Sequence, residues 1–191
     1  VLQADKEFQK SIEIFRKVCD INPSDLKALS NLGKAYFDSG DLEKADLIFR
    51  KGIAIDRNYL PIQRHFVDLF VKLRDFEKAE KMVGEIMKIH PESASEHSAL
   101  GSIFEKKGQL EDARIHIEKA LKIDPNHTQA MEYMGEMYLT LNQPAKAEEL
   151  LARLNKLCSF NCVDRDLLKV AIKKLKRACD QVIERIDRVN N

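Results

Sequence analysis

Aromatic residues and glycine are scarce in this sequence of 191 residues. It has no tryptophan, its aromatic content is 7%, and it holds seven glycines. A low aromatic content suits helices that pack through Leu, Ile, Ala and Met. All seven glycines fall at turns or helix positions, so the sequence has no glycine-rich phosphate-binding loop. A His-Glu-x-x-His helix and a G-x-S-x-G elbow are also missing, and the five histidines are scattered. We therefore expect neither an enzyme nor a cofactor.

Long apolar runs and an excess of one charge are absent as well. No stretch approaches the ~18 apolar residues of a membrane-spanning helix, and the first residues have no signal-peptide pattern. Lys and Arg (32) almost balance Asp and Glu (31), which gives no reason to expect nucleic acid or an anionic membrane as a partner. With 44% hydrophobic and 33% charged residues, we expect a soluble globular protein. The expected compartment is the cytoplasm, or the periplasm if a leader has been trimmed.

What the sequence does contain is a repeat of 34 residues, clearest in residues 94–127. Three kinds of position recur at this period: glycine at Gly33, Gly101 and Gly135, alanine at Ala45, Ala79, Ala113 and Ala147, and an aromatic ring at Tyr36, Phe70, Phe104 and Tyr138. Within each unit, apolar residues are spaced by three and four, as in amphipathic helices. Such self-similarity predicts an all-α solenoid built from helical hairpins.

The period divides the chain into a repeat array at 1–163 and a C-terminal helix at 164–191. The complete units are expected at 26–59, 60–93, 94–127 and 128–158. Residues 1–25 hold a partial unit, because 6–19 match only the second helix of the pattern. We expect the array to begin inside a repeat. Pro61 and Pro144 each fall in a first helical turn, where proline is tolerated.

Three short motifs then indicate a family. Leu32 to Tyr36 reads L-G-x-x-Y, Leu100 to Phe104 reads L-G-x-x-F, and Met134 to Tyr138 reads M-G-x-x-Y. Over residues 6–158 the sequence resembles the tetratricopeptide repeat (TPR) family. The resemblance implies a right-handed superhelix that acts as a non-enzymatic scaffold and binds a protein or peptide segment in its concave groove.

The resemblance also implies which residues meet that partner, because in TPR proteins the first helix of each unit lines the groove. The expected groove residues are Lys27, Asn31, Lys34, Phe37, Arg64, Asp68, Ser98, Ser102, Glu105, Glu132, Tyr133 and Glu136. Basic residues lie toward the N-terminal end and acids toward the C-terminal end, so a segment of opposite polarity should fit. Chaperone-binding TPR proteins hold a terminal carboxylate with a clamp of polar and basic residues. Of the corresponding positions here, only Lys34 is basic where the clamp requires it. Binding of a heat-shock chaperone tail is therefore not expected.

The residues from 155 onward are interpreted as leaving the 34-residue frame. Their apolar residues step by four and three, which predicts one long helix with Asp164 or Asp166 as its cap. An assembly seam is placed at Leu168, Ile172, Leu175, Val182 and Ile186. Two readings stay open: the helix caps the array, or it drives homo-oligomers, which gives a structural module as the alternative function. The basic run from Arg165 to Arg177 is read as a solvated face and not as a nucleic-acid or membrane site.

The four cysteines are interpreted as structural. Cys158 and Cys162 form a Leu-Cys-x-x-x-Cys ending that resembles endings of bacterial TPR proteins, which points to a bacterial source. A disulfide between them requires a turn of the chain, and reduced buried thiols are expected. No second ligand pair lies nearby in the sequence, so metal binding is not expected. Cys19 and Cys179 are expected in the core.

Overall fold

The computed structural model describes residues 2–157 and 162–190, and for residues 2–7, 179, 180 and 182–190 it describes the backbone alone. Every regular element in these ranges is an α-helix, which confirms the all-α prediction. The helices fall into two compact units, Val1–Pro91 and Glu92–Asn191.

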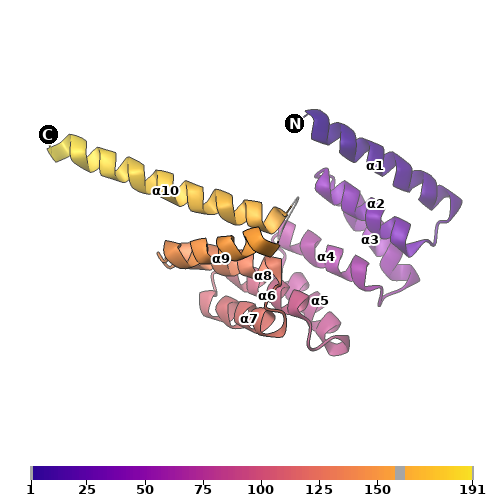
Figure 1. Ribbon diagram of the computed structural model, residues 1–191. Helices are drawn as coiled ribbons and strands as arrows, with labels where there is room; N and C mark the ends of the chain where they lie inside the picture. The colour runs from indigo at the N-terminus through magenta and orange to yellow at the C-terminus, as the bar shows by residue number, and fades with distance from the viewer. Residues whose placement is uncertain (1, 158–161, 191) are drawn as a thin grey trace. The chain divides into compact units, whose positions relative to one another are not determined.

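The first unit holds the helices α1 to α5 (Figure 1). Their bounds are α1 Leu2–Ile21, α2 Leu26–Asp38, α3 Leu42–Ile55, α4 Leu60–Lys72 and α5 Phe76–Ile89. Helices α2 and α3 pack as one hairpin and α4 and α5 as the next, while α2 also packs against α4. α1 is longer than the helix predicted at 6–19 and packs on α2. Pro61 lies in the first turn of α4, as predicted.

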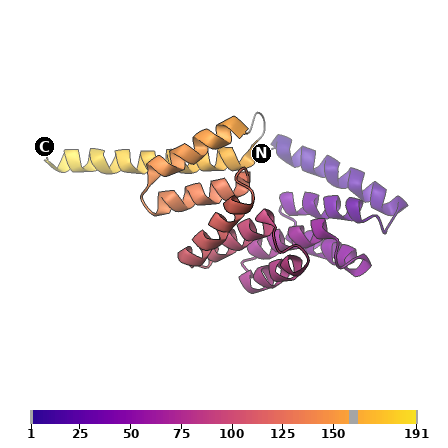
Figure 2. The same ribbon diagram turned by 60° about the horizontal axis from the view of Figure 1, so that its bottom comes forward.

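The second unit continues the plan with two hairpins and a long helix. Its helices are α6 Ala94–Lys106, α7 Leu110–Ile123, α8 Thr128–Thr140, α9 Pro144–Leu157 and α10 Val163–Asn190. α6 pairs with α7 and α8 with α9, while α8 also packs against α6 and α7. α10 packs on both α8 and α9, and its distal half runs on past their ends in both views (Figures 1 and 2).

Glycine at the repeated position lets the two helices of a hairpin approach closely. A Cβ built on Gly33 would lie 2.2 Å from the ring of Phe49, and one built on Gly101 would lie 2.4 Å from Cγ1 of Ile117. Each contact residue follows its glycine by 16 positions. Where Val67 replaces the glycine, the residue at the same spacing is the smaller Val83, and both valines are buried. The hairpins are thus held by complementary volumes.

The turn inside each hairpin also repeats in its backbone conformation. Gly40, Arg74, Gly108 and Asn142 are 34 residues apart, and all four have a positive φ, between 56° and 85°. Glycine adopts this conformation without strain, whereas an arginine does so at a cost. The residue after this position caps the second helix: Asp41 accepts a hydrogen bond from the backbone N–H of Lys44, and Asp75 from that of Lys78.

The structure of α10 differs in two respects from what the sequence predicted for residues 155–191. Leu168 and Ile172 lie 34 residues after Met134 and Tyr138, and they are 0% and 6% exposed in the core shared with α8 and α9. The repeat frame therefore continues into α10, and these two residues serve packing inside the chain and not an assembly seam. The helix also begins at Val163, so Asp164 and Asp166 lie in its first turn and not before it. Leu175 is half-buried, and the side chains of Val182 and Ile186 lie outside the described residues.

The cysteines agree only in part with the sequence analysis. Cys19 is buried and free, as expected. Cys162 is buried and forms a disulfide, where a reduced thiol was expected. Cys162 itself lies outside the helices, directly before α10. Cys158 and the side chain of Cys179 lie outside the described residues.

Candidate functional site

In the second unit, the predicted groove residues meet on one surface formed by α6 and α8. We call this surface the α6–α8 face and define it by Ser98, Ser102, Glu105, Glu132, Tyr133 and Glu136. The three residues of α6 are spaced by four and three and so share one side of the helix. Ser98 and Ser102 are 0% and 6% exposed, and they form the small-residue part of the face. α6 and α8 pack against each other, which brings the residues of the two helices together.

Glu132 is the most unusual residue of the α6–α8 face. Its side chain is 4% exposed, and none of the hydrogen bonds formed among the described residues involves its carboxyl group. Burial, together with the negative charges of Glu136, Asp164 and Glu105, raises the pKa of Glu132 to about 8, against the opposing effect of Lys106. At neutral pH this carboxyl group therefore holds a proton inside the protein.

The same surroundings affect a second carboxyl group of this face. Burial raises the pKa of Glu105, and the charge of Glu136 acts in the same direction. Lys106, the next residue of α6, lowers it. Four carboxyl groups thus lie close enough together to repel one another, and they outnumber the neighbouring cation. Such a cluster favours a bound positive charge.

Asp164 is the member of this cluster that the sequence analysis missed as a site residue. It lies in the first turn of α10 and accepts a hydrogen bond from Oγ1 of Thr128, at 2.6 Å, which joins α10 to the start of α8. The sequence did contain a signal: Leu168 stands one period after Met134, which would have placed α10 beside α8. This signal was missed because the residues from 155 onward were interpreted as lying outside the repeat frame.

Two further polar groups complete the description of the α6–α8 face. The hydroxyl group of Ser98 is fully buried and has no hydrogen-bond partner among the described residues. The hydroxyl oxygen of Tyr133 accepts a hydrogen bond from the side-chain amide of Gln129, at 3.1 Å. Ser98 is thus an unsatisfied hydroxyl group inside the protein, whereas Tyr133 is already engaged.

The groove residues predicted in the first unit lie on α2 and α4. Lys34 donates to both carboxylate oxygens of Asp38, at 2.5 and 2.6 Å, and its ammonium group lies 5.8 Å from the centre of the Phe37 ring. Its charge is therefore partly neutralised inside the chain, which weakens the basic end expected there. Lys27 is exposed and Asn31 is half-buried on the same helix.

On α4, the expected residues are Arg64 and Asp68. Both are exposed, and Asp68 lies 3.9 Å from the ring nitrogen Nδ1 of His65. The predicted groove residues thus fall into two sets, one on α2 and α4 and one on α6 and α8. The acidic set contains the more perturbed groups.

Metal-ligand clusters and membrane-spanning helices are both absent from the described part of the chain. No group of three or more His, Cys, Asp or Glu side chains there could hold a metal ion. None of the helices in that part has the length and apolar character needed to cross a membrane.

Comparison with known proteins finds helical repeats. The sequence profile of the tetratricopeptide repeat family matches residues 94–127 and residues 26–59. The chain is 26% identical to the protein CTR9 homolog of Arabidopsis thaliana over 123 residues, which are 62% of this chain and 11% of that protein. It is 22% identical to the BBSome complex member BBS4 of Bos taurus over 151 residues, 79% of this chain and 29% of that protein. The chain thus corresponds to less than a third of the length of these relatives.

A solved structure is similar over most of its length. A thermophilic TPR protein of Thermus thermophilus superposes with a TM-score of 0.76 at 19% identity, covering 90% of this chain and 93% of that one. At this identity the likeness concerns the fold. Together with the two matched repeats and the 34-residue period of buried positions, it leads to one assignment. The chain contains tetratricopeptide repeats, matched at residues 26–59 and 94–127, and shares its fold with tetratricopeptide repeat proteins.

Proposed function

We propose that the chain is a non-enzymatic interaction scaffold whose α6–α8 face binds a protein segment through a lysine or arginine side chain. The observation that carries this proposal is the buried carboxyl group of Glu132 with three further acids around it. A cationic side chain placed there would meet a negative field that Lys106 compensates only in part. Glu105, Tyr133 and Glu136 are half-buried, so they are the residues of this face that a partner can reach.

Docking of such a cation should displace the proton of Glu132. An ammonium or guanidinium group nearby favours the ionised carboxylate, so its pKa falls when the partner binds. At neutral pH the bound state then holds fewer protons than the free state. The affinity should therefore rise with pH until Glu132 is ionised in the free protein, near its pKa of about 8.

The relatives support an interaction role in general. One of them is described as a member of the BBSome complex. The absence of a complete carboxylate clamp argues against a chaperone tail, because Lys34 is already paired with Asp38.

The test uses two acetylated and amidated peptides, Ala-Leu-Lys-Ala-Leu-Lys and the same sequence with glutamine in place of lysine. Titration calorimetry of the full chain should detect the lysine peptide and not the glutamine peptide. It should also show proton release when buffers of different ionisation enthalpy are compared. The variant Glu132→Gln together with Glu136→Gln should weaken binding at least about tenfold, the value of one lost charge-assisted hydrogen bond.

The control is Glu149→Gln, which removes one charge from the exposed outer side of α9. Its affinity should equal that of the parent chain. Equal losses in the site variant and the control would mean that only net charge matters, and the proposal would then fail. The same failure would follow from tight binding of the glutamine peptide.

The alternative function is a structural module that assembles through α10. It is favoured by the distal half of this helix, which runs beyond α8 and α9 (Figure 2). A chain ending at Ala178 would keep Leu168 and Ile172 in the core while removing that distal half. Light scattering after gel filtration should then show a dimer for the full chain and a folded monomer for the shortened one. The same number of chains per particle in both samples would exclude assembly through α10.

A further inference from the structure

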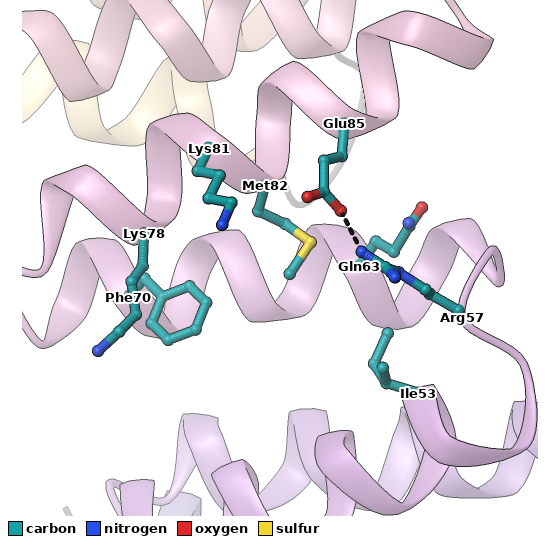
Figure 3. A pocket seen from close by; sticks show the side chains of 8 residues that line it. All are labelled: Ile53, Arg57, Gln63, Phe70, Lys78, Lys81, Met82 and Glu85. Carbon is teal, nitrogen blue, oxygen red and sulfur yellow. Dashed lines mark hydrogen bonds and ion pairs between the residues drawn. The ribbon is translucent and has the colours of Figure 1, made fainter.

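The first unit contains a cavity of about 480 Å³ between α3, α4 and α5 (Figure 3). Its lining residues are Ile53, Arg57, Gln63, Phe70, Lys78, Lys81, Met82 and Glu85. The volume lies within the range of pockets that hold small organic groups. None of these residues belongs to the α6–α8 face, so the cavity is a separate feature.

The floor and walls of the cavity offer an apolar surface from three elements. Ile53 comes from the end of α3, Phe70 from α4 and Met82 from α5. Phe70 is 7% exposed, whereas Ile53 and Met82 are half-buried, so apolar atoms of both remain open to a ligand. A thioether adapts its shape to different apolar groups. An apolar body would therefore lose contact with water here.

Most of the charged groups around the cavity are already paired. Nη2 of Arg57 lies 3.1 Å from Oε2 of Glu85, an ion pair drawn in Figure 3. Lys78 is held by Asp75 at 2.5 Å and lies over the ring of Phe70 at 5.7 Å. Lys81 is different, because it is exposed and forms no ion pair within the described part of the chain. One ammonium group is thus left for a ligand.

Gln63 provides a second polar group. It is 4% exposed, lines the cavity from the first turns of α4, and its side-chain amide has no hydrogen-bond partner among the described residues. Its amide is not among the fully buried groups that lack a partner, so water can reach it from the cavity, and a ligand that bonds to the amide can take the place of that water. An unpaired cation and an unpaired amide therefore line one apolar cavity.

We propose that this cavity binds an apolar group that carries one carboxylate. Its carboxylate pairs with the ammonium group of Lys81 and accepts a hydrogen bond from the amide N–H of Gln63, while its apolar body contacts Ile53, Phe70 and Met82. One free cation among the described residues that line the cavity matches one negative charge and not the two of a phosphate monoester. The same chemistry occurs in a small carboxylic acid and in a glutamate beside a large apolar side chain of a partner protein.

The experiment follows the side-chain amide of Gln63 by NMR in the full ¹⁵N-labelled chain, with its signal assigned by its loss in Gln63→Leu. The probe is 4-phenylbutyrate, and 4-phenylbutanol is its match without a carboxylate. We expect a saturable shift of the Gln63 amide with 4-phenylbutyrate and binding of 4-phenylbutanol at least about tenfold weaker. A second probe, acetyl-Gly-Leu-Glu-Phe-Gly-amide, distinguishes the two sources, because tighter binding of the peptide indicates a protein segment and tighter binding of 4-phenylbutyrate a small molecule.

Three variants test the assignment of the carboxylate to Lys81. Lys81→Gln should weaken 4-phenylbutyrate binding about tenfold, and Lys81→Arg should retain it. Lys88→Gln is the control, since Lys88 is exposed on the same helix and does not line the cavity. The proposal is overturned if the Gln63 amide shows no saturable shift with either probe, if the alcohol binds as tightly as the acid, or if Lys81→Gln and Lys88→Gln lose equal affinity.

Discussion

Gly135 of α8 lies directly against Leu168 of α10: a Cβ on Gly135 would come within 2.6 Å of both methyl carbons of that leucine. Leu168 is fully buried, so it has little space into which it can move. The first half of α10 is therefore packed on α8 as tightly as the helices inside a hairpin are packed on each other.

The first prediction is that Gly135→Ala destabilises the second unit by roughly 1 to 3 kcal/mol, because an added methyl group overpacks the contact with Leu168. Urea unfolding followed by circular dichroism measures this change. The matched control is Gly84→Ala in α5, where nothing lies within 4 Å of the added Cβ. That variant should gain up to about 1 kcal/mol from helix propensity. A Gly135→Ala chain as stable as the parent would contradict the close packing.

The second prediction concerns the left-handed position in the hairpin turns. Arg74 has a φ of 61° where Gly108 occupies the equivalent place with a φ of 79°. Arg74→Gly should stabilise the chain by up to about 1 kcal/mol, since the strain of a side chain in this region disappears. Gly108→Ala should destabilise it by about 1 kcal/mol for the converse reason. Melting temperatures of the two variants should therefore move in opposite directions, and equal signs would refute the argument.

The third prediction is a pH dependence of stability that comes from Glu132. Between the ordinary carboxyl pKa of 4.5 and about 8, the folded chain keeps a proton that the unfolded chain releases. The free energy of unfolding should therefore fall as the pH rises through this window. Glu132→Gln removes this effect and should be more stable than the parent by roughly 1 to 3 kcal/mol at pH 7.5.

Urea unfolding of both proteins from pH 5 to 8.5 measures this difference. The comparison also removes the effect of His97, whose pKa is lowered by burial and which acts in the acidic range in both proteins. The two stability curves should approach each other as the pH falls toward 5, because the unfolded chain then begins to bind the proton that the folded chain already holds. Curves that stay parallel over the whole range would show that Glu132 is ionised in the folded chain.

The fourth prediction concerns the cap of α7. Asp41 and Asp75 cap α3 and α5, but Gln109 at the equivalent position makes no hydrogen bond to the first turn of α7. Gln109→Asp should stabilise the chain by about 1 kcal/mol, because a carboxylate satisfies a free backbone N–H there. Gln109→Asn, which can cap without a charge, separates the hydrogen bond from the interaction with the helix dipole. Thermal unfolding at pH 7 measures both, and an unchanged melting temperature would contradict the prediction.

The fold could be predicted from the sequence because the 34-residue period repeats both the small residues and the turns. Gly33 and Gly101 are informative alone, since each is needed for a close approach of two helices. The place of α10 was missed because its apolar residues fit a step of four and three as well as the repeat frame. Lys169, where the pattern has glycine, removed the most visible marker of the frame.

The candidate site was predictable only in part. Glu105, Glu132 and Glu136 follow from the positions of α6 and α8 in the repeat, but the proton held by Glu132 depends on its burial and on Asp164, which comes from another helix. The pair of Lys34 and Asp38 was readable from their spacing of four residues. The position of the Gln63 amide in the cavity could not be predicted, because the sequence does not show which neighbouring side chains bond to it.

The place of Leu168 in the repeat frame bears on how such a chain can change its length. α10 packs against α8 and α9 in the way that α8 packs against α6 and α7. A further 34-residue unit placed before α8 would leave the contact between Gly135 and Leu168 unchanged. The packing of α10 is thus compatible with arrays of different lengths before α8.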